Sequence, residues 1–325
     1  MPLMPRVLEW CRSSCLPLII LGSGFAAFGG QLSGYLEAHD PSTILKCSDR
    51  YWTFATGRGV SSLWSTNLVE WHRGERVFET PPSWTSSAIP GNRGFFWAPD
   101  IMKLTNGFHL FYSVSTWGSP VSAIGLVTSP TLDPRDPRYK WSDRGVVIQS
   151  ARNDNFNAID PSVLLDRSGR LWMAFGSFWS GIKLIELDPA NGLRIKPDSP
   201  IHSLAWKQEI EAAFLWQRGD YYYLFVNWGL CCRGTNSTYN IRVGRSRVAT
   251  GPYLDKSGKD LMQGGGSLFL ETKDSIIGPG HAAIVEKDGR EYVSFHYYDG
   301  KRSGAKTLGL LPLKWSEGGW PQVVF

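Results

Sequence analysis

Residues 157–165 read Asn-Ala-Ile-Asp-Pro-Ser-Val-Leu-Leu, and this stretch recurs in altered form along the chain. Residues 39–45 give the clearest second copy, His-Asp-Pro-Ser-Thr-Ile-Leu. An aromatic and apolar run follows each copy, at residues 50–54 and 170–175. Looser copies, each followed by a similar run, occupy residues 97–101, 210–214 and 280–284. Five copies spaced by roughly 50 to 70 residues indicate a repeat architecture, and strand–turn–strand units of this size are typical of propeller blades.

The repeats also align residues that can carry chemistry. If Pro41, Pro99, Pro161, Ala212 and Ala282 are equivalent, the preceding residues are Asp40, Ala98, Asp160, Glu211 and His281. Equivalent positions on the inner strands of a propeller face the central axis, so three carboxylates and one imidazole should converge there. A single Asp-Pro pair is often only a turn or strand entry, but burying several carboxylates together is costly unless function requires them. We therefore predict an all-β, five-bladed β-propeller with a central active-site cavity.

The first thirty residues read as a separate segment. Arg6 and Arg12 precede an apolar run at residues 15–28 that ends in small residues, which is the arrangement of a secretory signal peptide. The run is shorter than the roughly 18 residues that span a bilayer, so a membrane anchor is disfavoured. We predict a signal peptide over residues 1–30 and a single catalytic propeller domain over residues 31–325. The mature protein should be secreted or periplasmic, with no membrane association after the signal is removed.

The composition suits a carbohydrate-binding propeller. The chain contains 15 Trp, 12 Tyr, 16 Phe and 35 Gly, a mixture that favours short strands, tight turns and stacking of indole rings on sugars. Most of these aromatic residues should pack between blades. The formal net charge of +5 is modest and is not gathered in runs, so we expect no nucleic-acid partner.

The cysteines do not indicate a metal site by their spacing. Cys11 and Cys15 fall in the predicted signal peptide, which leaves Cys47, Cys231 and Cys232. Neighbouring cysteines are not spaced as zinc ligands, and the sequence has no Cys-x-x-Cys pair. The adjacent pair could form a vicinal disulfide in an oxidising compartment or remain as two buried thiols. We favour a structural role in shaping a loop at the site.

A series of motifs occurs in order from about Gly34 to the C-terminus. They are His-Asp-Pro-Ser (39–42), Phe-Trp-Ala-Pro-Asp (96–100), Ala-Ile-Asp-Pro-Ser (158–162), Gly-Ser-Phe-Trp-Ser-Gly (176–181), Ile-Glu-Ala (210–212), Cys-Cys-Arg-Gly (231–234) with Asn-Ser-Thr-Tyr (236–239), and Gly-Pro-Gly-His (278–281). Together they resemble glycoside hydrolase family 43 and, within it, the arabinanases that act on 1,5-linked arabinan. The sequence departs from the family pattern in having Glu-Ala-Ala where Glu-Ala-Pro is common.

The resemblance implies roles for the three carboxylates. Asp40 would be the general base, Glu211 the general acid, and Asp160 would orient Glu211 and raise its pKa by like-charge repulsion. Because members of the family invert configuration, the carboxyl groups of Asp40 and Glu211 should lie roughly 6.5 to 9.5 Å apart. Glu209 is a competing candidate for the acid, since it lies two residues away on the same strand face. Glu211 is favoured because it aligns with the repeat.

Further residues are candidates for binding the substrate and an ion. The substrate-binding candidates are Trp97, Asn157, Ser177, Phe178, Trp179, Ser180 and Gly181. Trp97 could equally pack between blades, whereas the flanking glycines of residues 176–181 let the backbone approach a furanose closely. The Gly-Pro-Gly-His match implies that His281 helps to hold a single ion on the propeller axis. Calcium is the first expectation, with sodium or a halide as alternatives, because one histidine does not select calcium.

The predicted function is that of a secreted glycoside hydrolase that cleaves the α-1,5-L-arabinofuranosidic bonds of arabinan or arabino-oligosaccharides with inversion. An α-L-arabinofuranosidase or β-xylosidase of the same fold is the alternative within the family. A non-catalytic sugar-binding propeller is the alternative from another class, but such a protein should have lost at least one of the three acids. We expect a monomer, and cleavage within the polymer or from its end are both compatible with the sequence.

Overall fold

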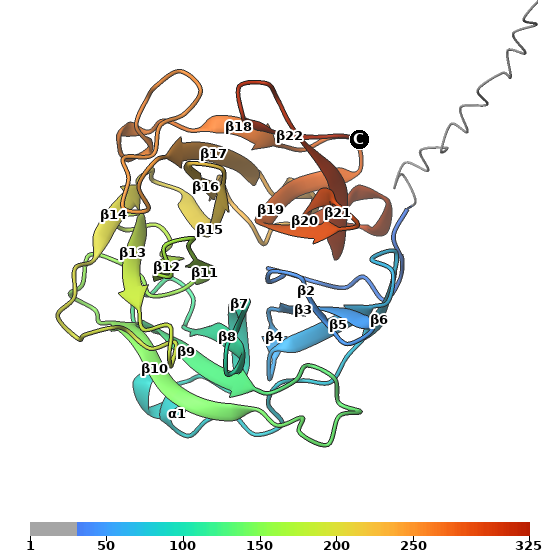
Figure 1. The fold of residues 1–325 in the computed structure, drawn as a ribbon, viewed down its shortest axis with the longest axis vertical. Coiled ribbons are helices and arrows are strands. Elements are labelled where there is room, and N and C mark those ends of the chain that lie inside the picture. The colour runs from blue at the N-terminus through green and yellow to red at the C-terminus, as the bar shows by residue number, and fades with distance from the viewer. Residues whose placement is uncertain (1–30) are drawn as a thin grey trace, which may run out of the picture.

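Five sheets surround a central axis in the computed structural model, which describes residues 31–325 (Figure 1). The predicted signal peptide, residues 1–30, lies outside the described residues. Within residues 31–325, no helix is both long and apolar enough to cross a membrane. The predicted all-β, five-bladed propeller is confirmed.

Each sheet is one blade, and neighbouring strands within it are almost all antiparallel. The first blade has the order β1(Ser33–Gly34), β6(Glu70–Arg73), β5(Ser61–Ser65), β3(Arg50–Ala55), β2(Leu45–Cys47). The second has β10(Ser142–Ser150), β9(Ser122–Ser129), β8(Gly107–Val114), β7(Phe95–Leu104), β4(Gly57–Arg58), and the short helix α1(Trp84–Ala88) precedes β7.

The remaining blades have four strands each, in sequence order. The third contains β11(Ser162–Leu165), β12(Leu171–Phe175), β13(Ile182–Leu187) and β14(His202–Ala205). The fourth contains β15(Ile210–Arg218), β16(Tyr221–Trp228), β17(Asn240–Ser246) and β18(Ser267–Leu270), with the 3-10 turns η1(Gly234–Asn236) and η2(Leu261–Gln263). The fifth contains β19(Ile276–Lys287), β20(Arg290–Asp299), β21(Ala305–Trp315) and β22(Pro321–Val323), with η3(Gly300–Arg302).

The ring closes through the segment that precedes the first full blade. The sequence did not show how this closure is made. Strand β1 pairs in parallel with β6, and a few residues later Glu37 forms an antiparallel bridge with Thr307 of β21. The amide of Leu308 donates to the carbonyl of Leu36 at 2.8 Å. The N-terminal segment therefore joins the first blade to the last, whose ribbons lie side by side in Figure 1.

Apolar packing between blades follows from the alternating runs of the sequence. At the closure, Ile44 and Leu63 of the first blade pack in one core with Val285 and Tyr292 of the fifth. The buried carboxylate of Asp100 adds a polar contact between other blades. Asp100 is 4 % exposed, and its two carboxylate oxygens accept the amides of Thr43 at 3.0 Å and Val163 at 2.8 Å. Asp100 thus links the second blade to the first and third, in keeping with a structural role.

A left-handed residue marks the same position in every blade. The positive φ angles are 51° at Asp40, 34° at Ala98, 59° at Asp160, 55° at Ala212 and 57° at His281. Strand register agrees, because the bulge of β15 lies between Glu211 and Phe214 and that of β19 between Gly280 and Ala283. The predicted register of the fourth blade is therefore wrong by one residue: Ala212, and not Glu211, is equivalent to the axial residues. The fourth copy has no proline, so two successive alanines left its register undefined.

Candidate active site

A cavity of about 1020 Å³ is lined by residues of all five blades. Asp40, Asp160, Glu211 and His281 all line it, although Glu211 reaches it from the position before the repeat residue. The left-handed residue bends the chain before the inner strand in the first and third blades and within it in the other three, which lets neighbouring positions face the same space. The predicted central cavity and the convergence of three carboxylates are thus confirmed.

Asp40 is held by a hydroxyl and surrounded by imidazoles. Thr56 Oγ1 donates to Oδ2 of Asp40 at 2.6 Å, and Nδ1 of His39 lies 3.1 Å from the same oxygen. Nδ1 of His281 lies 3.3 Å from the other oxygen, Oδ1. Burial alone would raise the pKa of Asp40, but His39 and His281 outweigh burial and hold the pKa well below its usual value. Asp40 is therefore an ionised carboxylate at neutral pH.

Glu211 is in the opposite protonation state. Ser177 Oγ donates to Oε2 of Glu211 at 2.7 Å, and the hydroxyl of Tyr239 donates to Oε1. Burial, and next the charge of Asp160, raise the pKa of Glu211 to about 8. A carboxyl group with this pKa keeps its proton at neutral pH and can donate it.

Asp160 is fixed beside Glu211 by the backbone. The amide of Ala212 donates to Oδ2 of Asp160 at 3.0 Å, while the amide of Asp160 donates to Ser113 Oγ at 3.0 Å. Burial raises the pKa of Asp160 to about 6, so the group is ionised above that pH. The hydrogen bond to the Ala212 amide thus holds the negative charge of Asp160 next to Glu211.

Three histidines, His39, His281 and His296, surround Asp40, and the first two line the cavity. Burial lowers the pKa of His39, but Asp40 outweighs it and raises the value to about 9. His296 is fully buried, its Nδ1 accepts the amide of Asp40 at 3.1 Å, and burial holds its pKa well below the usual value. The sequence predicted only His281. His39 could have been found, because it stands next to Asp40 in the quoted motif, whereas no spacing pointed to His296.

The structure brings most of the predicted binding residues to the cavity. Lining residues include Trp97, Asn157, Ser177, Phe178 and Trp179. Ser180 and Gly181 are not among them. The Ser180 amide donates to the carbonyl of Asn155 at 2.9 Å, and a Cβ on Gly181 would lie 2.1 Å from the Ala205 carbonyl oxygen. These two residues therefore shape the loop against its neighbours instead of forming the cavity wall.

Exposed aromatic rings at the cavity were missed by the sequence analysis. Phe95, Trp117 and Trp206 line it and are 48 %, 77 % and 46 % exposed. Trp117 stands edge-on to Trp97, with 6.0 Å between ring centroids. Large exposed aromatic faces at a concave site are suited to stacking on sugar rings. These rings lie outside the repeated motifs, so no spacing identified them.

Glu209, the competing acid candidate, does not line the cavity. Its carbonyl oxygen accepts the amide of Gly229 at 3.2 Å, which fixes the start of β15 against the end of β16. Glu209 lies in a turn before β15, which begins at Ile210, so the two residues do not share a strand face. The geometry favours Glu211.

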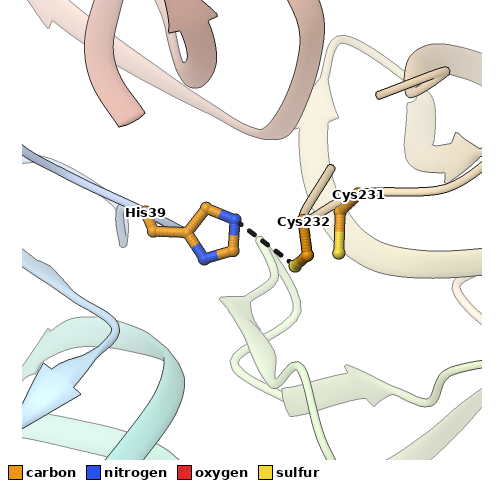
Figure 2. A group of neighbouring side chains, drawn as sticks. All are labelled: His39, Cys231 and Cys232. Carbon is orange, nitrogen blue, oxygen red and sulfur yellow. Dashed lines mark hydrogen bonds between the residues drawn. The ribbon is translucent and has the colours of Figure 1, made fainter. Parts of the chain in front are cut away.

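The adjacent cysteines also line the cavity, and Figure 2 shows them beside His39. Cys47, Cys231 and Cys232 are free thiols among the described residues, and Cys232 is exposed, so the pair is neither a disulfide nor two buried thiols. A hydrogen bond from Cys231, helped by His39, lowers the pKa of Cys232 to about 5. The predicted loop at the site is present.

Comparison with known proteins places this geometry in context. The sequence model of Glycosyl hydrolases family 43 matches residues 35–321. The extracellular exo-α-(1→5)-L-arabinofuranosidase ArbA of Cellvibrio japonicus is 40 % identical, over 97 % of this chain and 93 % of the relative. The extracellular endo-α-(1→5)-L-arabinanase 1 of Bacillus subtilis is 41 % identical, over 91 % and 90 %. The solved structure of Cellvibrio cellulosa α-L-arabinanase complexed with arabinohexaose has a TM-score of 0.84 and 40 % identity, over 89 % of this chain and 96 % of the other.

Proposed function

Since the chain belongs to glycosyl hydrolase family 43, we propose that it hydrolyses the α-1,5-L-arabinofuranosidic bonds of arabinan and arabino-oligosaccharides with inversion. The observation that carries the proposal is the contrast between two carboxyl groups that line one cavity. Asp40 has a pKa held well below its usual value, whereas that of Glu211 is raised to about 8. Opposite shifts on two carboxyl groups assign a base and an acid.

In the proposed mechanism one water attacks the anomeric carbon in a single displacement. Asp40 takes a proton from that water while the water oxygen forms a bond to the anomeric carbon. Glu211 gives its proton to the glycosidic oxygen, so that the bond between this oxygen and the anomeric carbon breaks and the leaving sugar departs as an alcohol. Asp160 keeps Glu211 protonated until this step. A non-catalytic sugar-binding propeller would not need these protonation states.

Substrate binding is assigned to the rings and hydroxyls of the cavity wall. Trp97, Phe178 and Trp179 offer faces for furanose rings, and Trp117 extends this surface. Ser177 would hold Glu211 in place while Phe178 and Trp179 contact the sugar. The relatives named as extracellular support secretion of this chain.

We also propose that His281 contributes to a site for a single ion on the axis, calcium first and sodium or a halide as alternatives. The support is that Nδ1 of His281 is buried without a hydrogen-bond partner and lies beside the Asp40 carboxylate. One imidazole and one carboxylate are few ligands for calcium, so solvent would complete the coordination. Such an ion would supply positive charge near the carboxyl groups.

Product analysis on linear 1,5-α-arabinan tests the proposal. We expect the wild-type protein to release either a ladder of oligomers, if it cleaves within the polymer, or one short product, if it cleaves from an end. Glu211→Gln should lose about 100- to 10,000-fold in kcat, because the general acid is removed. Glu209→Gln is the matched control and should keep its activity.

Two results would contradict the proposal. A wild-type protein that releases nothing from arabinan would refute the substrate, and xylan and aryl arabinofuranosides would then be tested for the alternative activities. A fully active Glu211→Gln variant would refute the assignment of the acid.

A further inference from the structure

Three potential metal ligands meet in the wall of the cavity. A ring nitrogen of His39 and the Sγ atoms of Cys231 and Cys232 all lie within 4.8 Å of one another. His39 precedes β2, and the cysteines follow β16, so that 193 residues separate His39 from Cys232. In Figure 2 the imidazole points toward the Cys232 sulfur. The separation in sequence explains why the spacing of the cysteines alone did not reveal the group.

The distances suit a tetrahedral ion with little movement. Cys232 Sγ lies 3.9 Å from His39 Nε2. Typical zinc–nitrogen and zinc–sulfur bonds place the two donor atoms about 3.6 Å apart in a tetrahedral site. A shift of a few tenths of an ångström in the exposed Cys232 side chain would close this difference.

The surroundings of His39 match those of a metal-binding histidine. Its second nitrogen, Nδ1, lies 3.1 Å from Oδ2 of Asp40. Histidines that bind metals almost always direct the other ring nitrogen to a carboxylate or carbonyl, which fixes the ring. The hydroxyl of Tyr298 lies 3.0 Å from Nε2 and accepts the amide of Cys232 at 2.6 Å, so this hydroxyl would have to turn away from Nε2 when an ion binds. The ring is 8 % exposed, so its orientation is defined by packing as well.

We propose that His39, Cys231 and Cys232 form a binding site for a soft divalent metal ion such as zinc or cadmium. The fourth coordination position would face the cavity, because all three residues line it. On binding, Cys232 coordinates as the thiolate, the Cys231 thiol releases its proton to solvent, and any proton on Nε2 also passes to solvent as the ion takes its place. Thiolate and imidazole ligands select soft ions over calcium and magnesium, so this site is distinct from the proposed axial site at His281.

Occupation of the site should inhibit hydrolysis. The ion would share His39 with Asp40 and would add a charged, coordinating group to the wall on which substrate must fit. This consequence rests on the proposed role of Asp40, whereas metal binding itself does not. The two claims therefore need separate measurements.

Cadmium titration tests binding without reference to activity. The full chain, with Cys11 and Cys15 replaced by serine and the remaining thiols reduced, is titrated with Cd²⁺ while its ultraviolet thiolate-to-cadmium charge-transfer absorption is followed. We expect saturation at one equivalent, with binding at least tenfold weaker in Cys231→Ser and in Cys232→Ser. Cys47→Ser is the matched control and should bind as the parent does. Thermal unfolding of each variant verifies that it is folded.

Several results would overturn the site. They are no charge-transfer absorption in the parent, unchanged binding in Cys232→Ser, or equal weakening in Cys47→Ser. For inhibition, each variant is compared with its own metal-free rate on arabinan. Zinc should inhibit the parent at a concentration at least tenfold lower than it inhibits Cys232→Ser. Equal inhibition of both would refute the inhibitory role, and the cadmium result still stands if the protein does not hydrolyse arabinan.

Discussion

Replacing Asp160 by asparagine should move the alkaline limb of the pH–rate profile. The pKa of Glu211 is raised from 4.5 to about 8, which corresponds to about 5 kcal/mol between its protonated and ionised forms. Burial is the largest cause and remains in the variant, but the charge of Asp160, the second cause, is lost. Because Asp160 titrates at about 6, it is ionised throughout the pH range in which Glu211 loses its proton.

The sign of the change follows from the role of Glu211 as an acid. Glu211 works while protonated, so a lower pKa ends activity at a lower pH. We expect the apparent pKa of the alkaline limb of kcat/KM to move from about 8 to a value one to two units lower. This shift corresponds to a loss of about 1.4 to 2.8 kcal/mol in the preference of Glu211 for its protonated form. The variant keeps an oxygen that can accept the Ala212 amide, so local structure should persist. Activity should recover when the pH is lowered below the new limb.

The assay is hydrolysis of arabino-oligosaccharides across pH, with thermal unfolding as the measure of folding. Asp100→Asn is the matched control, because Asp100 is a buried carboxylate outside the cavity. Its profile should keep the parent limb. An unmoved limb in folded Asp160→Asn would show that Asp160 does not raise the pKa of Glu211, and the electrostatic reasoning would fail.

Three further predictions concern stability, binding and the ion. Asp100→Ala should lower the free energy of unfolding by about 2 to 5 kcal/mol in urea, because a buried amide and a partly buried amide lose their acceptor; a loss below about 1 kcal/mol would contradict the bridging role. Trp117→Ala should raise KM about two- to tenfold for long oligosaccharides through loss of stacking, and an equal effect on the shortest substrate would count against a remote platform. EDTA should lower the activity and Ca²⁺ restore it, whereas His281→Ala should have low activity that no longer responds to EDTA; a parent unaffected by EDTA would exclude calcium.

The sequence predicted features that repeat and missed those that do not. Asp40 and Asp160 were found because a following proline marks the same blade position in each copy. Glu211 was identified correctly as a cavity residue, but its register was off by one because Ala212 and Ala213 replace that marker. The carboxylate of Glu211 marked it as a candidate even though the alignment of the fourth copy was wrong.

Contacts made only by the closed ring had no local signal. Trp117 and Trp206 reach the cavity from segments without repeated motifs. His39 and Cys232 meet across 193 residues, a distance over which spacing rules for cysteine and histidine say nothing. Closure through Glu37 and Thr307 likewise depends on which blade ends lie together, and pairing by a segment of so few residues leaves no alternating pattern to detect.

The junction between the first and last blades passes through the active site. Asp40 belongs to the first blade, yet His281 and His296, which contact it, belong to the last. A chain lacking β19 and β20 would carry all three acidic residues, but Asp40 would lack two of the histidines that surround it and the part of the cavity wall that the last blade supplies. The surroundings of the proposed base are therefore complete only when the two ends of the ring meet.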